Sequence, residues 1–223
     1  MAETTAPSAM SPAEEEGVFY HEAALNASWT GVRLALGGMS FLFGSFVFAF
    51  FYLKSLNSHG LWYTPSGQFP TVPKAWYGVV IMALVVVSAV VQTGVLQLIK
   101  RGNKAAWQRG ALVALVLGLA AVALSILQLL YLPFWPGESG FASVFVGFWP
   151  VYLLLALCEM VWLETLIMKA RSIPQISFVE QPPTYAEAFA VQRFQASLSA
   201  FTVAWNYLAV VAVVAWILFY LVH

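Results

Sequence analysis

The sequence predicts an all-α integral membrane protein with five transmembrane helices. Hydrophobic residues make up 61% of the 223 positions and charged residues only 9%, whereas charged residues make up roughly a quarter of an average soluble domain. A helix needs about 20 mostly apolar residues to cross the hydrocarbon core of a bilayer, and five separate stretches reach that length. These two observations place almost the whole chain inside a membrane.

The five predicted spans follow one another with short connections, so neighbouring helices are expected to pack antiparallel. They cover approximately residues 32–53, 77–99, 111–134, 142–168 and 196–222. The sequence therefore predicts one membrane domain, residues 31–223, behind a polar N-terminal tail, residues 1–30. We expect the first half of that tail to be disordered. It has neither the basic start nor the apolar centre of a signal peptide.

The connections contain no phosphate-binding glycine loop. The longest, residues 170–194, carries a proline pair and a possible amphipathic turn at residues 185–193. It is either a linker or a docking surface for a partner.

Lysine and arginine are distributed unevenly between the ends of the spans. If the N-terminus is inside, the inner side collects Arg33, Lys100, Arg101, Lys104, Arg109, Lys169, Arg171 and Arg193. Only Lys54 and Lys74 are left outside. Because cytoplasmic connections carry an excess of these residues, we expect a cytoplasmic N-terminus and a C-terminus on the other side. Four of the cations are candidate contacts for lipid headgroups or for the inner face: Arg33, Lys100, Arg101 and Arg109.

Tryptophan and tyrosine residues stand at several predicted membrane boundaries, where their rings often lie at the level of the headgroups. Three flank or lie in the first outer loop, one the second and one the basic inner loop: Trp62, Tyr63, Trp76, Trp135 and Trp107. The sequence predicts an interfacial position for each of them.

Composition excludes several kinds of site. The net charge is zero, so no basic surface indicates nucleic acid as a partner. The single cysteine, Cys158, lies in an apolar run, where we expect it to be buried, and it excludes a disulfide framework. The three histidines, His21, His59 and His223, all lie outside the predicted spans. Since membrane haem and copper sites take their ligands from histidines within helices, we expect no cofactor in this chain.

Polar residues inside the spans are the candidate functional groups, because polar groups at membrane depth are costly. Glu159 lies deep in the fourth span. It is either a carboxylate that holds a proton or contacts another subunit, or a protonated group hydrogen-bonded to a neighbouring helix. Gln92, Gln97, Gln128 and Asn206 are expected to form hydrogen bonds between helices.

Small residues in two spans predict close helix packing. In the first span these are Gly37, Gly38, Ser40, Gly44 and Ser45, and in the third Gly118, Ala121 and Ser125.

Four spans carry short patterns in a recognisable order. The first contains Gly38 and Ser45 within GGMSFLFGS, and the third contains Gln128 within GLAAVALSILQLLYL. The fourth begins SGFASVFVGFWPVYLLLAL, and the last, FTVAWNYLAVVAVVAWILFYLV, contains Asn206. Over residues 30–222 this order resembles subunit III of the haem-copper terminal oxidases, in the five-helix form that lacks the family's first two helices.

The polar signature of that family is replaced in this chain. Phe46 and Tyr131 stand where the family has glutamates, Trp149 and Tyr152 where it has two histidines, and Asn206 where its last helix has a histidine. The resemblance is therefore to a divergent member.

The resemblance implies an accessory subunit without cofactors that supports the stability and proton uptake of a catalytic oxidase subunit in aerobic respiration. Haem and copper would lie in that partner, subunit I, and phospholipids would be held in a cleft between helices. The chain would then be a non-catalytic subunit of a cytochrome c or quinol oxidase, with the electron donor set by other subunits. We expect it in a prokaryotic plasma membrane. The alternatives are a subunit III-like component of a nitric oxide reductase, and a small transporter or channel-like protein that uses Glu159.

Overall fold

A computed structural model describes residues 12–56, 62, 72–173 and 185–222. Within these residues all regular structure is helical, and five helices are long and apolar enough to cross a membrane. They are α1 (Pro12–Ser55), α2 (Ala75–Lys100), α3 (Lys104–Leu130), α4 (Gly140–Ser172) and α5 (Tyr185–Trp216), which continues as the π-helical η2 (Ile217–Val222). The predicted all-α class and its five membrane-length helices are confirmed.

The ends of three helices differ from the predicted spans. Helix α1 begins at Pro12, so residues 12–30, predicted as part of a polar tail, continue the first span as helix. A proline in the first turn followed by glutamates is a favourable helix start. Helix α3 ends at Leu130 instead of residue 134 because Pro133 follows closely. The turn predicted at residues 185–193 is the beginning of α5. Of the first half of the tail, which was expected to be disordered, residues 1–11 lie outside the described residues and the rest is helical.

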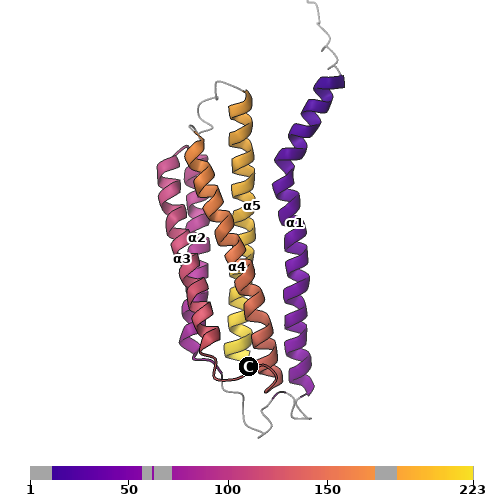
Figure 1. Cartoon of the computed structure of the whole chain (residues 1–223), viewed down its shortest axis with the longest axis vertical. Coiled ribbons are helices and arrows are strands. Elements are labelled where there is room, and N and C mark those ends of the chain that lie inside the picture. The colour runs from indigo at the N-terminus through magenta and orange to yellow at the C-terminus, as the bar shows by residue number, and fades with distance from the viewer. Residues whose placement is uncertain (1–11, 57–61, 63–71, 174–184, 223) are drawn as a thin grey trace, which may run out of the picture.

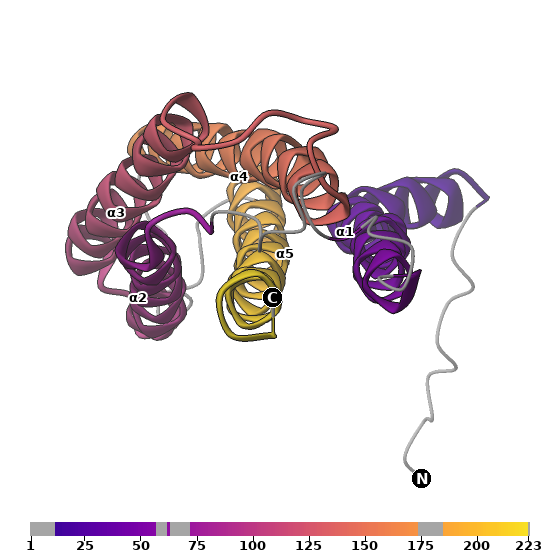
Figure 2. The same ribbon diagram turned by 90° about the horizontal axis from the view of Figure 1, so that it is seen from below.

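Helix α5 is the centre of the bundle and packs against α1, α2 and α4, while α3 packs against α2 and α4. Seen along the helices, α5 lies between α2 and α1, with α4 above it in the view (Figure 2). Helix α1 is the least buried of the five, and its first turns lean away from the other helices (Figure 1). The seam between α1 and the α4–α5 pair is therefore the most open part of the molecule.

The antiparallel order brings the predicted inner-face cations to one end, which we call the basic end. The start of α1, the end of α2, the start of α3, the end of α4 and the start of α5 all lie there (Figure 1). Two contacts order this end. Asn103 caps α3 by accepting a hydrogen bond from Ala106 N at 3.0 Å, and Lys104 Nζ donates to the carbonyl of Ile173 after α4.

Aromatic rings fill the core near the opposite end. Trp62 is 1% exposed and packs edge-on against Phe50 and Phe141, with ring centroids 5.0 and 5.8 Å away. At the basic end Trp107 is fully buried against Phe194. Both rings therefore lie inside the bundle against aromatic partners, and their predicted level at the membrane boundary stays a prediction. Trp76 and Trp135 are exposed, and Tyr63 lies outside the described residues.

Candidate functional site

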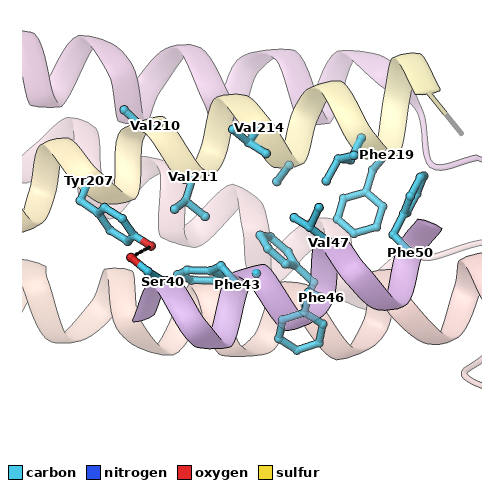
Figure 3. Close-up of a pocket in the computed structure, with 14 residues that line it drawn as sticks. Ser40, Phe43, Phe46, Val47, Phe50, Tyr207, Val210, Val211, Val214 and Phe219 are labelled. Carbon is cyan, nitrogen blue, oxygen red and sulfur yellow. Dashed lines mark hydrogen bonds between the residues drawn. The ribbon is translucent and has the colours of Figure 1, made fainter. Parts of the chain in front are cut away.

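The candidate site is the seam between α1 and the α4–α5 pair. It contains an apolar groove of about 230 Å³ between α1 and α5 (Figure 3). Val210 and Val214, which line it, are exposed, so the groove opens to the outside of the bundle. At one end of it, Tyr207 OH donates a hydrogen bond to Ser40 Oγ at 3.0 Å. The other lining residues are apolar and include Phe43, Phe46, Val47, Phe50, Leu218 and Phe219.

The wall between α1 and α4 is an aromatic cluster. The Phe46 ring rests on Gly147, where an added Cβ would lie 3.3 Å from it. Phe46 packs edge-on against Phe148 with centroids 5.7 Å apart, and Phe148 stacks on Tyr152 at 6.0 Å. Trp149 is 5.7 Å from Tyr152. Phe148 thus links Phe46 with Trp149 and Tyr152, and these three are positions where the oxidase resemblance expects ionisable residues.

Two of the predicted intramembrane amides form hydrogen bonds to a residue on another helix. Gln128 Nε2 on α3 donates to Tyr220 OH on η2, and Asn206 Nδ2 on α5 donates to Thr93 Oγ1 on α2 at 3.0 Å. Gln97 differs, because it is exposed and no hydrogen bond of its side chain to another described residue is found.

Further hydrogen bonds, buried inside the bundle, connect α2 to α3 and α5. Ser88 Oγ donates to Ala114 O at 2.7 Å and accepts from Trp205 Nε1 at 3.1 Å. Gln92 Nε2 donates to Thr202 Oγ1 at 3.5 Å. The prediction that Gln92 bonds between helices is confirmed.

Glu159 lies on α4, half-buried. Its Oε2 is buried and has no hydrogen-bond partner among the described residues. The hydrogen bond to a neighbouring helix, one of the two readings of this carboxyl, is therefore not found for Oε2.

The small residues of the two spans have opposite surroundings. In α3, Gly118, Ala121 and Ser125 are buried, and a Cβ on Gly118 would lie 2.1 Å from Met160 Sδ on α4. In α1, Gly38 has nothing within 4 Å of such a Cβ, and Ser45 is exposed, bonding only to its own helix at Phe41 O. The packing role predicted for Gly38 and Ser45 is wrong within this chain.

Gly38 and Ser45 do not pack against other helices because of the orientation of α1. It turns a different face, with Met39, Phe43 and Phe50, toward α4 and α5. The sequence does not reveal which of two faces a lone apolar helix buries.

At the basic end the same seam holds a second, polar hollow of about 400 Å³. Lys169 from α4 and Arg193 from α5 line it, together with Ser28, Ser172 and Ser197. The predicted headgroup contacts are spread elsewhere over this end: Arg33, Arg101 and Arg109 are exposed and Lys100 closes α2. Sequence reasoning missed this pair, although the two cations flank one connection and stand at the ends of helices joined by it.

No three histidine, cysteine, aspartate or glutamate side chains lie close enough to hold a metal ion within the described ranges. Cys158, expected to be buried, is exposed on α4.

In comparisons with known proteins, no protein-family model and no curated protein matches this chain. Its function is therefore argued from its own residues.

Proposed function

We propose that this chain is an accessory subunit of a haem-copper terminal oxidase, of the subunit III type, in a prokaryotic plasma membrane. It carries no catalytic group or cofactor of its own and packs against the catalytic subunit, whose stability and proton uptake it supports. The basic end faces the cytoplasm, in keeping with the excess of lysine and arginine there.

One observation carries this proposal. Positions 46, 149 and 152, which only the family resemblance connects, lie in one aromatic cluster between α1 and α4. Trp149 and Tyr152 are neighbours on α4 because they are three residues apart, and Phe46 from the distant α1 joins them through Phe148. Their joint replacement by rings supports a member of the family in which an ionisable centre has become an apolar one.

The seam also supports the lipid-holding role that the resemblance implies. Its groove is lined almost entirely by apolar side chains, as an acyl chain requires, and its hollow at the basic end presents Lys169 and Arg193. Basic pockets between membrane helices at this level suit anionic headgroups. The double variant Lys169→Ala and Arg193→Ala should retain less anionic phospholipid after purification, measured by native mass spectrometry. Arg109→Ala, which removes an exposed cation at the same end, should retain as much as the wild type.

The main test is affinity purification of the tagged chain from its native membrane. We expect a large histidine-rich subunit to co-purify, with the absorbance of haem and with bound copper. A tagged multi-pass protein of unrelated function from the same membrane is the control. A colourless preparation of the chain alone would contradict the proposal. A complex that reduces nitric oxide instead of oxygen would assign it to the nitric oxide reductase alternative.

The buried, unpartnered Oε2 of Glu159 favours a second candidate, a small transporter or channel-like protein that moves protons or ions. Reconstitution of the purified chain in liposomes tests it. The candidate predicts flux down an imposed gradient that Glu159→Gln abolishes and that Glu164→Gln, on the exposed side of the same helix, leaves intact. Absence of flux in every gradient would exclude it.

A further inference from the structure

Two hydrogen-bonded pairs form a polar band on one face of the bundle. Asn206 on α5 bonds to Thr93 on α2, and Tyr207 on α5 bonds to Ser40 on α1, both at 3.0 Å. Figure 2 shows α5 between α2 and α1. Successive helical residues are 100° apart, so Asn206 and Tyr207 lie on the two edges of the exposed ridge of α5 that contains Val210.

The band lies at membrane depth and is open. Thr93 and Ser40 are exposed, and each lies about two helical turns, roughly 10 Å, inside a cation of the basic end, Lys100 and Arg33 respectively. Hydrocarbon offers no hydrogen-bond partner there, and polar side chains in membrane helices usually face the bundle interior. An exposed band at this depth therefore requires a reason.

The band also has unused hydrogen-bonding capacity. The Thr93 hydroxyl has one hydrogen, and both Ala89 O, at 2.9 Å, and Asn206 Oδ1, at 3.3 Å, are within its reach. Asn206 Oδ1 therefore shares its one donor with Ala89 O. One N–H of the Asn206 carboxamide is also left over after its bond to Thr93. An amide with a free N–H and a carbonyl oxygen that shares its donor matches another amide or a hydroxyl.

The surroundings of the band favour a helix as the occupant. Next to Thr93, Gly94 has nothing within 4 Å of an added Cβ, so another backbone can approach α2 closely here. Helix α3 exposes only apolar residues at the corresponding depth, Val113, Val116 and Leu119. The two faces of the bundle therefore differ in what they can bind.

We propose that the α2–α5–α1 face, centred on the polar band, docks a transmembrane helix of a different membrane protein that presents an amide or hydroxyl side chain at this depth. Lipid cannot supply that group within the hydrocarbon. Identifying this protein as the catalytic oxidase subunit rests on the proposed function, whereas the docking face itself does not.

Photo-crosslinking in native membranes tests the proposal. A photoreactive benzoylphenylalanine replaces Val210 on the docking face, where the side chain is 61% exposed, or Val116 on α3, where it is 63% exposed. Neither residue belongs to the polar band, although Val210 also lines the groove between α1 and α5, and equal yields of the two variants in detergent are the control for folding. Illumination should give a discrete heavier adduct with a second protein from position 210 and none from position 116.

The identity of the adduct separates this inference from the proposed function. A haem-containing subunit supports both. A membrane protein of another kind supports the docking face and contradicts the oxidase assignment. An adduct with a second copy of this chain, equal adducts from both positions, or lipid adducts alone from position 210 would overturn the docking face. In those cases co-purification of haem still decides the proposed function.

A second measurement examines the band itself. Asn206→Leu should reduce the position-210 adduct severalfold at unchanged chain yield, while Ser45→Ala, an exposed hydroxyl bonded only within α1, should not. An unchanged adduct in Asn206→Leu would contradict recognition through the band.

Discussion

At the scale of single residues, the same amino acid has different consequences on different helices. Gly110 on α3 is pressed against α2, since an added Cβ would lie 2.0 Å from Val95 Cγ1 and 3.2 Å from its Cβ. Gly38 on α1 has open space. Valine is branched at Cβ and cannot swing away without leaving its preferred rotamer. Of these two glycines, Gly110 is therefore the one that packing within the chain requires.

Gly110→Ala should lower the free energy of unfolding in detergent by about 1–3 kcal/mol, the usual cost of overpacking. Gly38→Ala should cause no loss and should add up to about 1 kcal/mol from helix propensity. Thermal denaturation followed by circular dichroism measures both. Val95→Ala combined with Gly110→Ala should restore stability, and equal effects of the two glycine variants would contradict this account.

Substitution of Glu159 tests whether its carboxyl group stabilises the fold. Since its Oε2 is buried without a partner, Glu159→Met should raise the unfolding free energy by up to about 3 kcal/mol, the order of cost on insertion scales. Glu164→Met, on the exposed side of α4, should change it less. The same denaturation experiment measures both variants. If Glu159→Met is instead destabilising, the carboxyl has a favourable partner.

At the scale of helices, Ser88 on α2 connects three of them through hydrogen bonds. Its hydroxyl donates to Ala114 O on α3 and accepts from Trp205 Nε1 on α5. Ser88→Ala should cost about 1–2 kcal/mol, because the buried Trp205 N–H loses its acceptor. Ser45→Ala should be nearly neutral, since that exposed hydroxyl bonds only to its own helix. Equal melting temperatures for the two variants would show that the hydrogen bonds of Ser88 contribute nothing to stability.

The helices themselves could be predicted from the sequence because bilayer thickness sets their length. Their ends could not. Helix α1 continues to Pro12 beyond any apolar run, since helix propensity does not stop where hydrocarbon does. The burial of Trp62 and Trp107 could not be predicted either, because a ring near the end of a span is visible in the sequence and the aromatic partner that buries it is not.

The candidate site was predictable only in part, because the sequence shows polar residues in apolar runs but does not show how the helices pack. Gln128 and Asn206 were found as interhelical amides because polarity in an apolar run is visible in sequence. The groove and the hollow were not, since they arise where α1 diverges from α4 and α5, a property of tertiary packing. That Lys169 and Arg193 line the same hollow likewise depends on how the ends of α4 and α5 pack.

At the scale of the whole molecule, five antiparallel helices bring seven cations of the connections to one end: Lys100, Arg101, Lys104, Arg109, Lys169, Arg171 and Arg193. Lys54 and Lys74 belong to the other end. If all five helices cross the membrane, the two ends of the described chain lie on opposite sides of it. The charge asymmetry then decides between only two orientations.

We predict that the basic end is cytoplasmic, and the two ends of α3 can test this in cells. In a Cys158→Ser background, one cysteine is introduced either by Ala105→Cys, at the basic end, or by Glu138→Cys, in the connection after α3; both positions are exposed. A membrane-impermeant maleimide should label position 138 in intact cells and position 105 only after permeabilisation, because one span separates them. The reverse pattern would invert the molecule and place Lys169 and Arg193 away from the anionic cytoplasmic leaflet, which would remove the electrostatic basis for an anionic headgroup in the hollow.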